Sequence, residues 1–260
     1  MFNKKILEDH LSTSWLGRNF IYFDELDSTN KYAKSLKSEA PLHGTLILAD
    51  NQVKGIGQYQ RTWEVSSGLN LTFSLIFQPE TQHAFNLLTI ACALAVANIC
   101  TKETGKKFRI KWPNDVICNG KKIAGILTEG IYSGNDFERL VIGIGLNVNE
   151  RQFTGELQET ASSLCLLTGK TFSKERLMAA LLAEIENNYQ AWYVKNVDLI
   201  KTANKNMIGF GDWVTLIIDG KEQPEKQKFL GVDEHGALVA LNKELELNTF
   251  FYEQIRIKTD

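Results

Sequence analysis

Residues 111–127 read KWPNDVICNGKKIAGIL, and this stretch decides how the first half of the chain folds. The dipeptide Asn119-Gly120 divides it into two runs that are rich in apolar residues. Asn-Gly is the strongest short-range signal for a β-hairpin, because both central positions of a type I′ turn need a positive φ. The sequence therefore predicts strands over residues 109–118 and 121–129, joined by a tight turn.

The strand before this turn carries a concentrated set of polar groups. Lys111, Asn114 and Asp115 supply a cation, an amide and a carboxylate in a short run. Pro113 favours an extended conformation in the residue before it and removes one ladder donor, which indicates a bent or edge strand. These residues are therefore candidates for a binding site. The alternative is an exposed Lys111–Asp115 pair beside a core Trp112.

Lys122 and Gly125 follow on the second strand. Strict alternation places Lys122 and Ala124 on one face and Gly125 on the other. A hairpin of this kind can present Lys122 beside Asn114 and Asp115, and a glycine lets a ligand lie close to the backbone. The alternative for Lys122 is a solvated lysine near a hairpin tip.

A second candidate segment lies upstream, where residues 50–63 read DNQVKGIGQYQRTW. Gly55 and Gly57 let the backbone bend tightly around an anionic or planar ligand. As a dinucleotide-binding fingerprint the segment fails, because the third glycine and the following helix are missing. Arg61 and Trp63 suit a phosphate and a flat ring, whereas the alternative interpretation is a mobile surface loop.

Strand and helix signals surround both segments. Strands are expected over residues 20–23, 45–49, 69–77 and 140–148. Helices are expected after Asp27-Ser28, over residues 85–103 and after Ser173.

Beyond residue 207 the pattern changes to short strands with turns at Asp219-Gly220 and His235-Gly236. The sequence thus predicts an α+β, or mixed α/β, domain over residues 1–206 and a small β-domain over residues 207–260.

The bulk composition is that of an ordinary soluble globular protein. The 260 residues are 43% apolar and 23% charged, with a net charge of −2, so a general affinity for nucleic acid or anionic membranes is not indicated. The four cysteines form no C-x-x-C pair, which favours free thiols and a cytoplasmic location. The longest apolar run, residues 90–99, is short and alanine-rich for a membrane span.

Five segments occur in the order, and at roughly the spacing, of the catalytic core of biotin–protein ligases. They are residues 27–30, residue 52 with residues 55–63, and residues 111–115, 122–129 and 143–147. The chain therefore resembles this family over most of residues 20–150, and Lys-Trp-Pro-Asn-Asp with Lys-x-x-Gly-Ile-Leu-x-Glu is the most specific part. The resemblance implies a catalytic domain of the biotin/lipoate ligase type, followed by a small SH3-like β-barrel domain.

The resemblance also implies a reaction. Biotin and ATP, with Mg²⁺, would give biotinyl-5′-AMP and pyrophosphate, and a lysine of a biotin carboxyl carrier domain would then take the biotin. Such a reaction joins two anions, so lysines and Mg²⁺ must offset their repulsion. No covalent enzyme intermediate is required, and positioning supplies much of the rate. We expect a cytoplasmic monomer or homodimer that binds no membrane.

Roles for individual residues follow from the resemblance alone. Lys122 and Lys111 are implied as catalytic lysines. The biotin side would comprise Ser28, Thr29, Gln52, Gly55, Ile56, Lys122 and Gly125. The nucleotide side would comprise Gln58, Arg61, Trp63, Lys111, Asn114, Asp115 and Asn147. No metal ligand is assigned.

The loop departs from the family pattern. Many relatives carry Gly-Arg-Gly-Arg-x-Gly-Arg, where this chain has Ile56, Gln58 and Gln60 in place of two arginines and a glycine. The loss of phosphate-attracting cations puts adenylate retention in question. About twenty residues precede the first expected strand, which is short for the DNA-binding module of some relatives, so we expect no DNA binding.

Two other functions compete with this interpretation. A lipoate ligase or octanoyl transferase shares the catalytic fold. A non-enzymatic sensor of biotinyl adenylate would use the same pocket without modifying a carrier.

Overall fold

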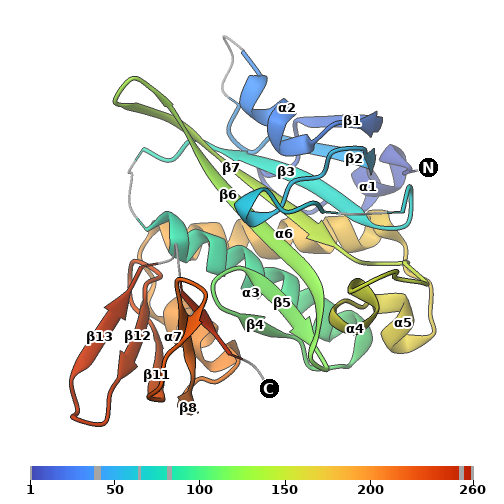
Figure 1. The fold of residues 1–260 in the computed structure, drawn as a ribbon. Helices are drawn as coiled ribbons and strands as arrows, with labels where there is room; N and C mark the ends of the chain where they lie inside the picture. The colour runs from blue at the N-terminus through green and yellow to red at the C-terminus, as the bar shows by residue number, and fades with distance from the viewer. Residues whose placement is uncertain (1, 38–41, 64–65, 81–83, 252–254, 259–260) are drawn as a thin grey trace.

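A seven-stranded sheet forms the centre of the computed structural model, which describes residues 2–37, 42–63, 66–80, 84–251 and 255–258 (Figure 1). Its order is β1-β2-β3-β7-β6-β5-β4. In that order the strands are Phe20–Leu26, Leu46–Gln52, Leu71–Phe77, Asp136–Leu146, Lys121–Ser133, Asp115–Cys118 and Arg109–Lys111. Only β1 and β2 pair in parallel among these neighbours, and the other pairs are antiparallel.

Helices cover the two faces of this sheet unequally (Figure 1). One face packs on α3 (Phe85–Thr104), which in turn packs against α6 (Lys174–Tyr193). On the other face α2 (Thr29–Ser35) covers a small cluster that includes Ile47 and Val141. The rest of that second face is left open for a site.

Helix α3 is apolar on nearly all sides, because it lies between the sheet and α6. By length and composition it could cross a membrane, but most of it is buried inside the protein, as in the core helix of a soluble domain. Gly105 ends it in the left-handed conformation at φ 70°.

Shorter helices complete the first part of the chain. They are α1 (Lys4–His10), α4 (Leu157–Thr160), α5 (Leu164–Thr168) and α7 (Val197–Asn206). The sequence interpretation missed them, although Asn196 caps α7 through its side chain and was a usable start signal.

In the described part of the chain after α7, the regular elements are all strands. They are β8 (Trp213–Val214), β9 (Leu216–Ile218), β10 (Lys221–Glu222), β11 (Gln227–Val232), β12 (Leu238–Leu241), β13 (Leu247–Phe250) and β14 (Ile255–Ile257). They form two sheets, in the orders β10-β9-β14 and β13-β12-β11-β8. The mixed α/β fold with small C-terminal antiparallel sheets is confirmed, but within these residues the sheets do not close into a barrel.

The expected hairpin is confirmed, with one correction. Asn119 and Gly120 adopt φ values of 51° and 76°, as a type I′ turn requires. The single strand predicted over residues 109–118 is wrong, because β4 and β5 are separate antiparallel strands that pair with each other. The chain reverses between them through the Trp112–Pro113 segment, whose peptide bond is cis.

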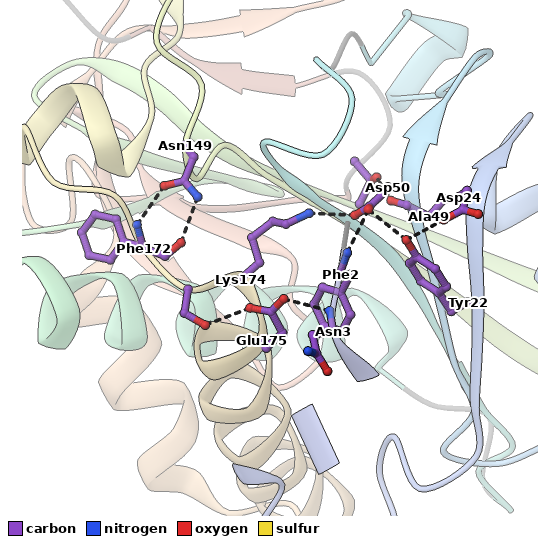
Figure 2. A network of polar contacts seen from close by, with 12 residues as sticks. Phe2, Asn3, Tyr22, Asp24, Ala49, Asp50, Asn149, Phe172, Lys174 and Glu175 are labelled. Atoms are coloured by element: carbon purple, nitrogen blue, oxygen red, sulfur yellow. Dashed lines mark hydrogen bonds and ion pairs between the residues drawn. The ribbon is translucent and has the colours of Figure 1, made fainter. Parts of the chain in front are cut away.

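A buried polar network holds the N-terminal residues and β1 against β2 and α6 (Figure 2). Asp50 on β2 accepts hydrogen bonds from the Phe2 amide at 3.0 Å and the Tyr22 hydroxyl at 2.9 Å, and it pairs with Lys174 on α6 at 2.7 Å. Burial by itself would raise the pKa of Asp50, but the bonds from Lys174 and Tyr22 lower it below its usual range. The network joins the N-terminus and β1 to α6, and it anchors β2 just before Gln52.

Candidate active site

A cavity of about 890 Å³ opens on the face of the sheet that α3 and α6 leave free. Of the residues predicted for the site, all except Gly55 line it. They are Ser28, Thr29, Gln52, Ile56, Gln58, Arg61, Trp63, Lys111, Asn114, Asp115, Lys122, Gly125 and Asn147. The fold thus brings together segments that lie far apart in the sequence.

Lys122 pairs with Asp115 across the β5–β6 hairpin, and their Nζ and Oδ1 atoms are 2.7 Å apart. The predicted proximity of these two residues is confirmed, but the predicted faces are wrong. Ile117 pairs with Lys122 and Val116 with Ala124, so Ile123 is an extra residue that forms a β-bulge.

This bulge turns Lys122 onto the face of Gly125. A Cβ atom placed on Gly125 would lie 3.0 Å from the Lys122 Nζ atom. The ammonium group therefore points into the cavity beside the glycine, where strict alternation would have separated the two residues.

Trp63 packs over two glycines that face each other across β6 and β7, Gly125 and Gly145. A Cβ atom on Gly145 would lie 2.3 Å from the indole Cε2 atom, so only glycine fits there. Lys122 Nζ lies 5.5 Å from the centroid of the indole ring. Among the described residues, the buried indole N–H has no acceptor, which leaves it available to donate to a bound ligand.

Gly55 closes the loop that carries Trp63. Its carbonyl accepts from the Trp63 amide at 3.0 Å, and Gly57 donates to the Arg61 carbonyl at 2.7 Å. A Cβ atom on Gly55 would lie 2.4 Å from the Trp63 carbonyl oxygen. The close approach at Gly55 is therefore to the loop's own backbone, and the residue does not line the cavity as the sequence interpretation expected.

The DSTN segment lies at the start of α2. Ser28 caps this helix, and its hydroxyl accepts from the Lys31 amide. The backbone N–H of Thr29 donates to Gln52 Oε1 at 2.7 Å, and the Thr29 hydroxyl lies 3.0 Å from the same oxygen. Thr29 and Gln52 thus form a fixed polar pair in the cavity.

Lys111, Asn114 and Asn147 surround the hairpin part of the cavity. Burial is the main cause that lowers the pKa of Lys111 from its usual value. Asn114 donates to the Ile126 carbonyl at 2.7 Å and Asn147 to the Ser162 carbonyl at 3.1 Å. These bonds fix the two amides and leave their orientation little freedom.

Arg256 on β14 also lines the cavity, and the sequence interpretation did not identify it. Its guanidinium donates to Gln58 Oε1 at 2.7 Å and lies 5.3 Å from the centroid of the Tyr59 ring. Arg61, by contrast, is exposed. The C-terminal sheets therefore supply a cation to the same loop in which the family's arginines are replaced.

Comparisons with known proteins agree with this arrangement. The sequence pattern of the Biotin/lipoate A/B protein ligase family matches residues 22–147. The bifunctional ligase/repressor BirA of Bacillus subtilis is 32% identical over 239 residues, which cover 90% of this chain and 73% of the relative. Biotin–protein ligase 2 of Arabidopsis thaliana is 31% identical, covering 72% of this chain and 57% of the relative.

A solved structure gives the same result. The biotin protein ligase of Aquifex aeolicus in complex with biotin and ATP superposes with a TM-score of 0.81 at 27% identity, covering 94% of this chain and all of the other. The chain belongs to the biotin/lipoate A/B protein ligase family, and within it to the ligase enzymes of the biotin protein ligase type.

Proposed function

We propose that this protein activates biotin with ATP and then attaches it to a lysine of a biotin carboxyl carrier domain. The observation that carries the proposal is the placement of Lys122. Its ammonium shares one cavity with the Thr29–Gln52 pair, a second lysine at position 111 and the Trp63 indole. Adenylate formation needs an acid and a nucleotide held side by side, with a cation that offsets the repulsion between their negative charges.

The biotin side of the cavity would use the polar pair at the start of α2. Ser28, Thr29 and Gln52 would bond the ureido ring, with Ile56 beside it. Lys122 would bind the carboxylate that is activated. In the described structure Asp115 holds Lys122 at 2.7 Å, so a bound carboxylate would compete with Asp115 for the same ammonium.

The nucleotide side would use the hairpin and the loop. Lys111, Asn114 and Asn147 would face the nucleotide, with Arg61 and Gln58 toward phosphate. The unpartnered N–H of Trp63 supports a role against a ligand acceptor, because a buried donor without a partner is costly. We add Arg256 to this side, because its guanidinium reaches the same cavity.

Mg²⁺ belongs to the proposal as a companion of ATP. No group of three or more His, Cys, Asp or Glu side chains among the described residues suits a metal ion. Protein sites for Mg²⁺ at nucleotides commonly use one or two carboxylates plus substrate phosphates, and Asp115 is a carboxylate in this cavity. The ion would neutralise phosphate charge, while the lysines hold and orient the reacting carboxylate.

The boundary near residue 207 stays a proposal as well. It is supported by the end of α7 at Asn206 and by the all-strand character of the described residues beyond it. The two parts pack closely, since the Trp112 indole donates to the Gly236 carbonyl at 3.2 Å. A cytoplasmic location also remains a prediction.

The carrier is proposed from the names of relatives. Proteins of Paracoccus denitrificans and Mycobacterium tuberculosis with 35% and 30% identity are named biotin–[acetyl-CoA-carboxylase] ligases. We therefore expect the acceptor to be the biotin carrier domain of a carboxylase.

Mass spectrometry of a carrier domain tests the proposal. The full chain is incubated with biotin, MgATP and the carrier domain, and the carrier should gain the mass of one biotin on one lysine. A parallel incubation replaces biotin with lipoate or octanoate. Modification of the carrier with lipoate or octanoate but not with biotin would show that the protein is a lipoate ligase or octanoyl transferase. Adenylate formation without carrier modification would favour the sensor of biotinyl adenylate.

A further inference from the structure

Polar side chains link the outer edge of α2 to the interior of the protein. Lys34 on α2 donates to Glu129 Oε1 at 2.6 Å, and Glu129 Oε2 accepts from Asn30 Nδ2 at 2.8 Å. Ser74 on β3 in turn donates to Asn30 Oδ1 at 2.5 Å. We call these four residues the relay. Asn30 and Ser74 are buried, whereas Lys34 and Glu129 are partly exposed.

The relay ends at the polar pair of the cavity. Ser74 Oγ lies 2.7 Å from Thr29 Oγ1, which lies 3.0 Å from Gln52 Oε1. Gly143 makes room for this arrangement, because a Cβ atom there would lie 2.2 Å from Asn30 Oδ1. The spacing of these atoms therefore depends on a glycine in β7 that does not itself need to touch a ligand.

The direction of each hydrogen bond follows from counting protons. A carboxylate only accepts, so Asn30 must turn its NH₂ group toward Glu129 and its oxygen toward Ser74. The amide oxygen also only accepts, so the single Ser74 proton goes to Asn30. Ser74 must then accept in its contact with Thr29, and its hydroxyl has no second proton to give.

This direction sets what the cavity offers to a ligand. Thr29 has one hydroxyl proton, and because Ser74 must accept in their 2.7 Å contact, Thr29 donates that proton to Ser74. Toward the cavity Thr29 therefore acts as an acceptor. Gln52 receives the Thr29 backbone N–H on its oxygen, so its NH₂ group remains as a donor. An acceptor beside a donor complements a ring N–H beside a carbonyl.

We propose that Glu129, held by Lys34 and acting through Asn30 and Ser74, is a positioning residue that sets the hydrogen-bond polarity of this end of the cavity. The polarity makes the cavity selective for a cyclic urea over a ring without N–H and C=O groups, such as a dithiolane. The inference rests on the proposed function, because the cyclic urea is the head group of biotin.

Glu129→Gln removes the constraint while keeping the size of the side chain. An amide can face Asn30 with either its oxygen or its nitrogen, so Asn30 can turn over and the whole series of bonds can reverse. We expect the KM for biotin to rise about tenfold, the worth of about one hydrogen bond. The KM for ATP and kcat should stay within about twofold, and desthiobiotin, which keeps the cyclic urea, should lose the same factor as biotin.

An exchange of the two groups provides the decisive rescue. Asn30→Asp alone places two carboxylates together and should also raise the KM for biotin. In the double variant Asn30→Asp/Glu129→Gln the amide at position 129 donates to the carboxylate at position 30, which accepts from Ser74. The original polarity and net charge return, so the KM for biotin should recover to within about threefold of the wild-type value.

Lysines of α2 give a matched control. Lys34→Met removes the support of Glu129 and should raise the KM for biotin by about two- to threefold, an exposed-pair effect. Lys31→Met changes an exposed lysine on the same helix and should leave it unchanged.

Three results would overturn the inference: an unchanged KM for biotin in Glu129→Gln, an equal rise of both KM values, or no recovery in a folded double variant. A wild-type protein that does not activate biotin at all would instead contradict the proposed function.

Discussion

The hairpin of residues 109–129 and the loop of residues 53–63 both border the cavity, but different forces hold them. Backbone ladders join the hairpin to its neighbours along almost its whole length. The loop has a few backbone bonds of its own, and side-chain contacts fix the rest, with Trp63 on the glycines of β6 and β7 and Gln58 on Arg256.

This difference separates preformed chemistry from adjustable closure. Side chains on the hairpin are placed by the sheet, so changes there should alter the reaction and spare the fold. The position of the loop depends on residues far away in the sequence, so changes in those residues should act on ligand retention. Four substitutions test the distinction, beginning with the largest expected effect.

Lys122→Ala removes the cation at the centre of the proposed chemistry. We expect the rate of biotin adenylation, followed as pyrophosphate release in a single turnover, to fall about 10²- to 10³-fold, because a charge-stabilising group in a partly buried site is lost. Lys121→Ala is the control, since its exposed ammonium bonds the Gln158 carbonyl outside the ion pair. A loss below tenfold in Lys122→Ala would show that the hairpin does not carry the reaction.

Gly145→Ala tests the contact that seats the loop. The new methyl group would meet the Trp63 indole at 2.3 Å, so either the loop or the strand must move. We expect a loss of about 1–3 kcal/mol in the free energy of unfolding, as for other overpacked sites. In a Trp63→Ala background the same Gly145→Ala substitution should cost less free energy of unfolding, because the indole that it would meet is gone. Thermal unfolding of the two single variants and the double variant measures this difference. Additive effects would mean that the indole does not rest on Gly145.

The same comparison explains what the sequence could predict. The hairpin follows from a local signal, Asn119-Gly120, and its polar residues lie near that signal. The bulge at Ile123 could not be predicted, because it arises from the pairing of β6 with β5. Alternation alone therefore assigned Lys122 and Gly125 to the wrong relative faces.

The sequence identified glycines as sites of close approach, but it did not identify the protein side chains that lie against them. A ligand at Gly125, which lines the cavity, stays a prediction, and the described structure adds Trp63 and Lys122 as neighbours of Gly125 and Asn30 as a neighbour of Gly143. Arg256 carried no local signal, because it reaches the cavity from the last strand, almost two hundred positions beyond Gln58. Contacts of this range depend on how the C-terminal sheets pack, which no short pattern encodes.

Arg256→Met tests the distant support of the loop. The variant keeps an unbranched side chain but removes the bond to Gln58 and the contact with Tyr59. We expect the KM for ATP to rise about tenfold, equivalent to one charge-assisted hydrogen bond, with the KM for biotin little changed. Lys258→Met is the matched control, because that lysine pairs with Glu222 in the same C-terminal segment. An equal rise of both KM values would indicate a general loss of packing.

The smallest effect is expected from a substitution of Lys111, which should shift the pH dependence of kcat/KM for ATP. Burial, and then the positive charges of Arg256 and Lys122, lower the pKa of Lys111, while Asp115 acts in the opposite direction. A lowered pKa means that this ammonium loses its proton at a lower pH than an ordinary lysine does. We therefore expect kcat/KM for ATP, which reports groups of the free enzyme, to decline on the alkaline side before pH reaches about 10.4, the value for an unperturbed lysine.

Lys111→Arg sharpens this prediction, since a guanidinium stays charged throughout that range. The alkaline decline should move to higher pH in Lys111→Arg, even if the variant is slower overall because its planar group fits the site differently. Profiles are measured from pH 7 upward at constant ionic strength. An unmoved decline in Lys111→Arg would assign the titration to another group.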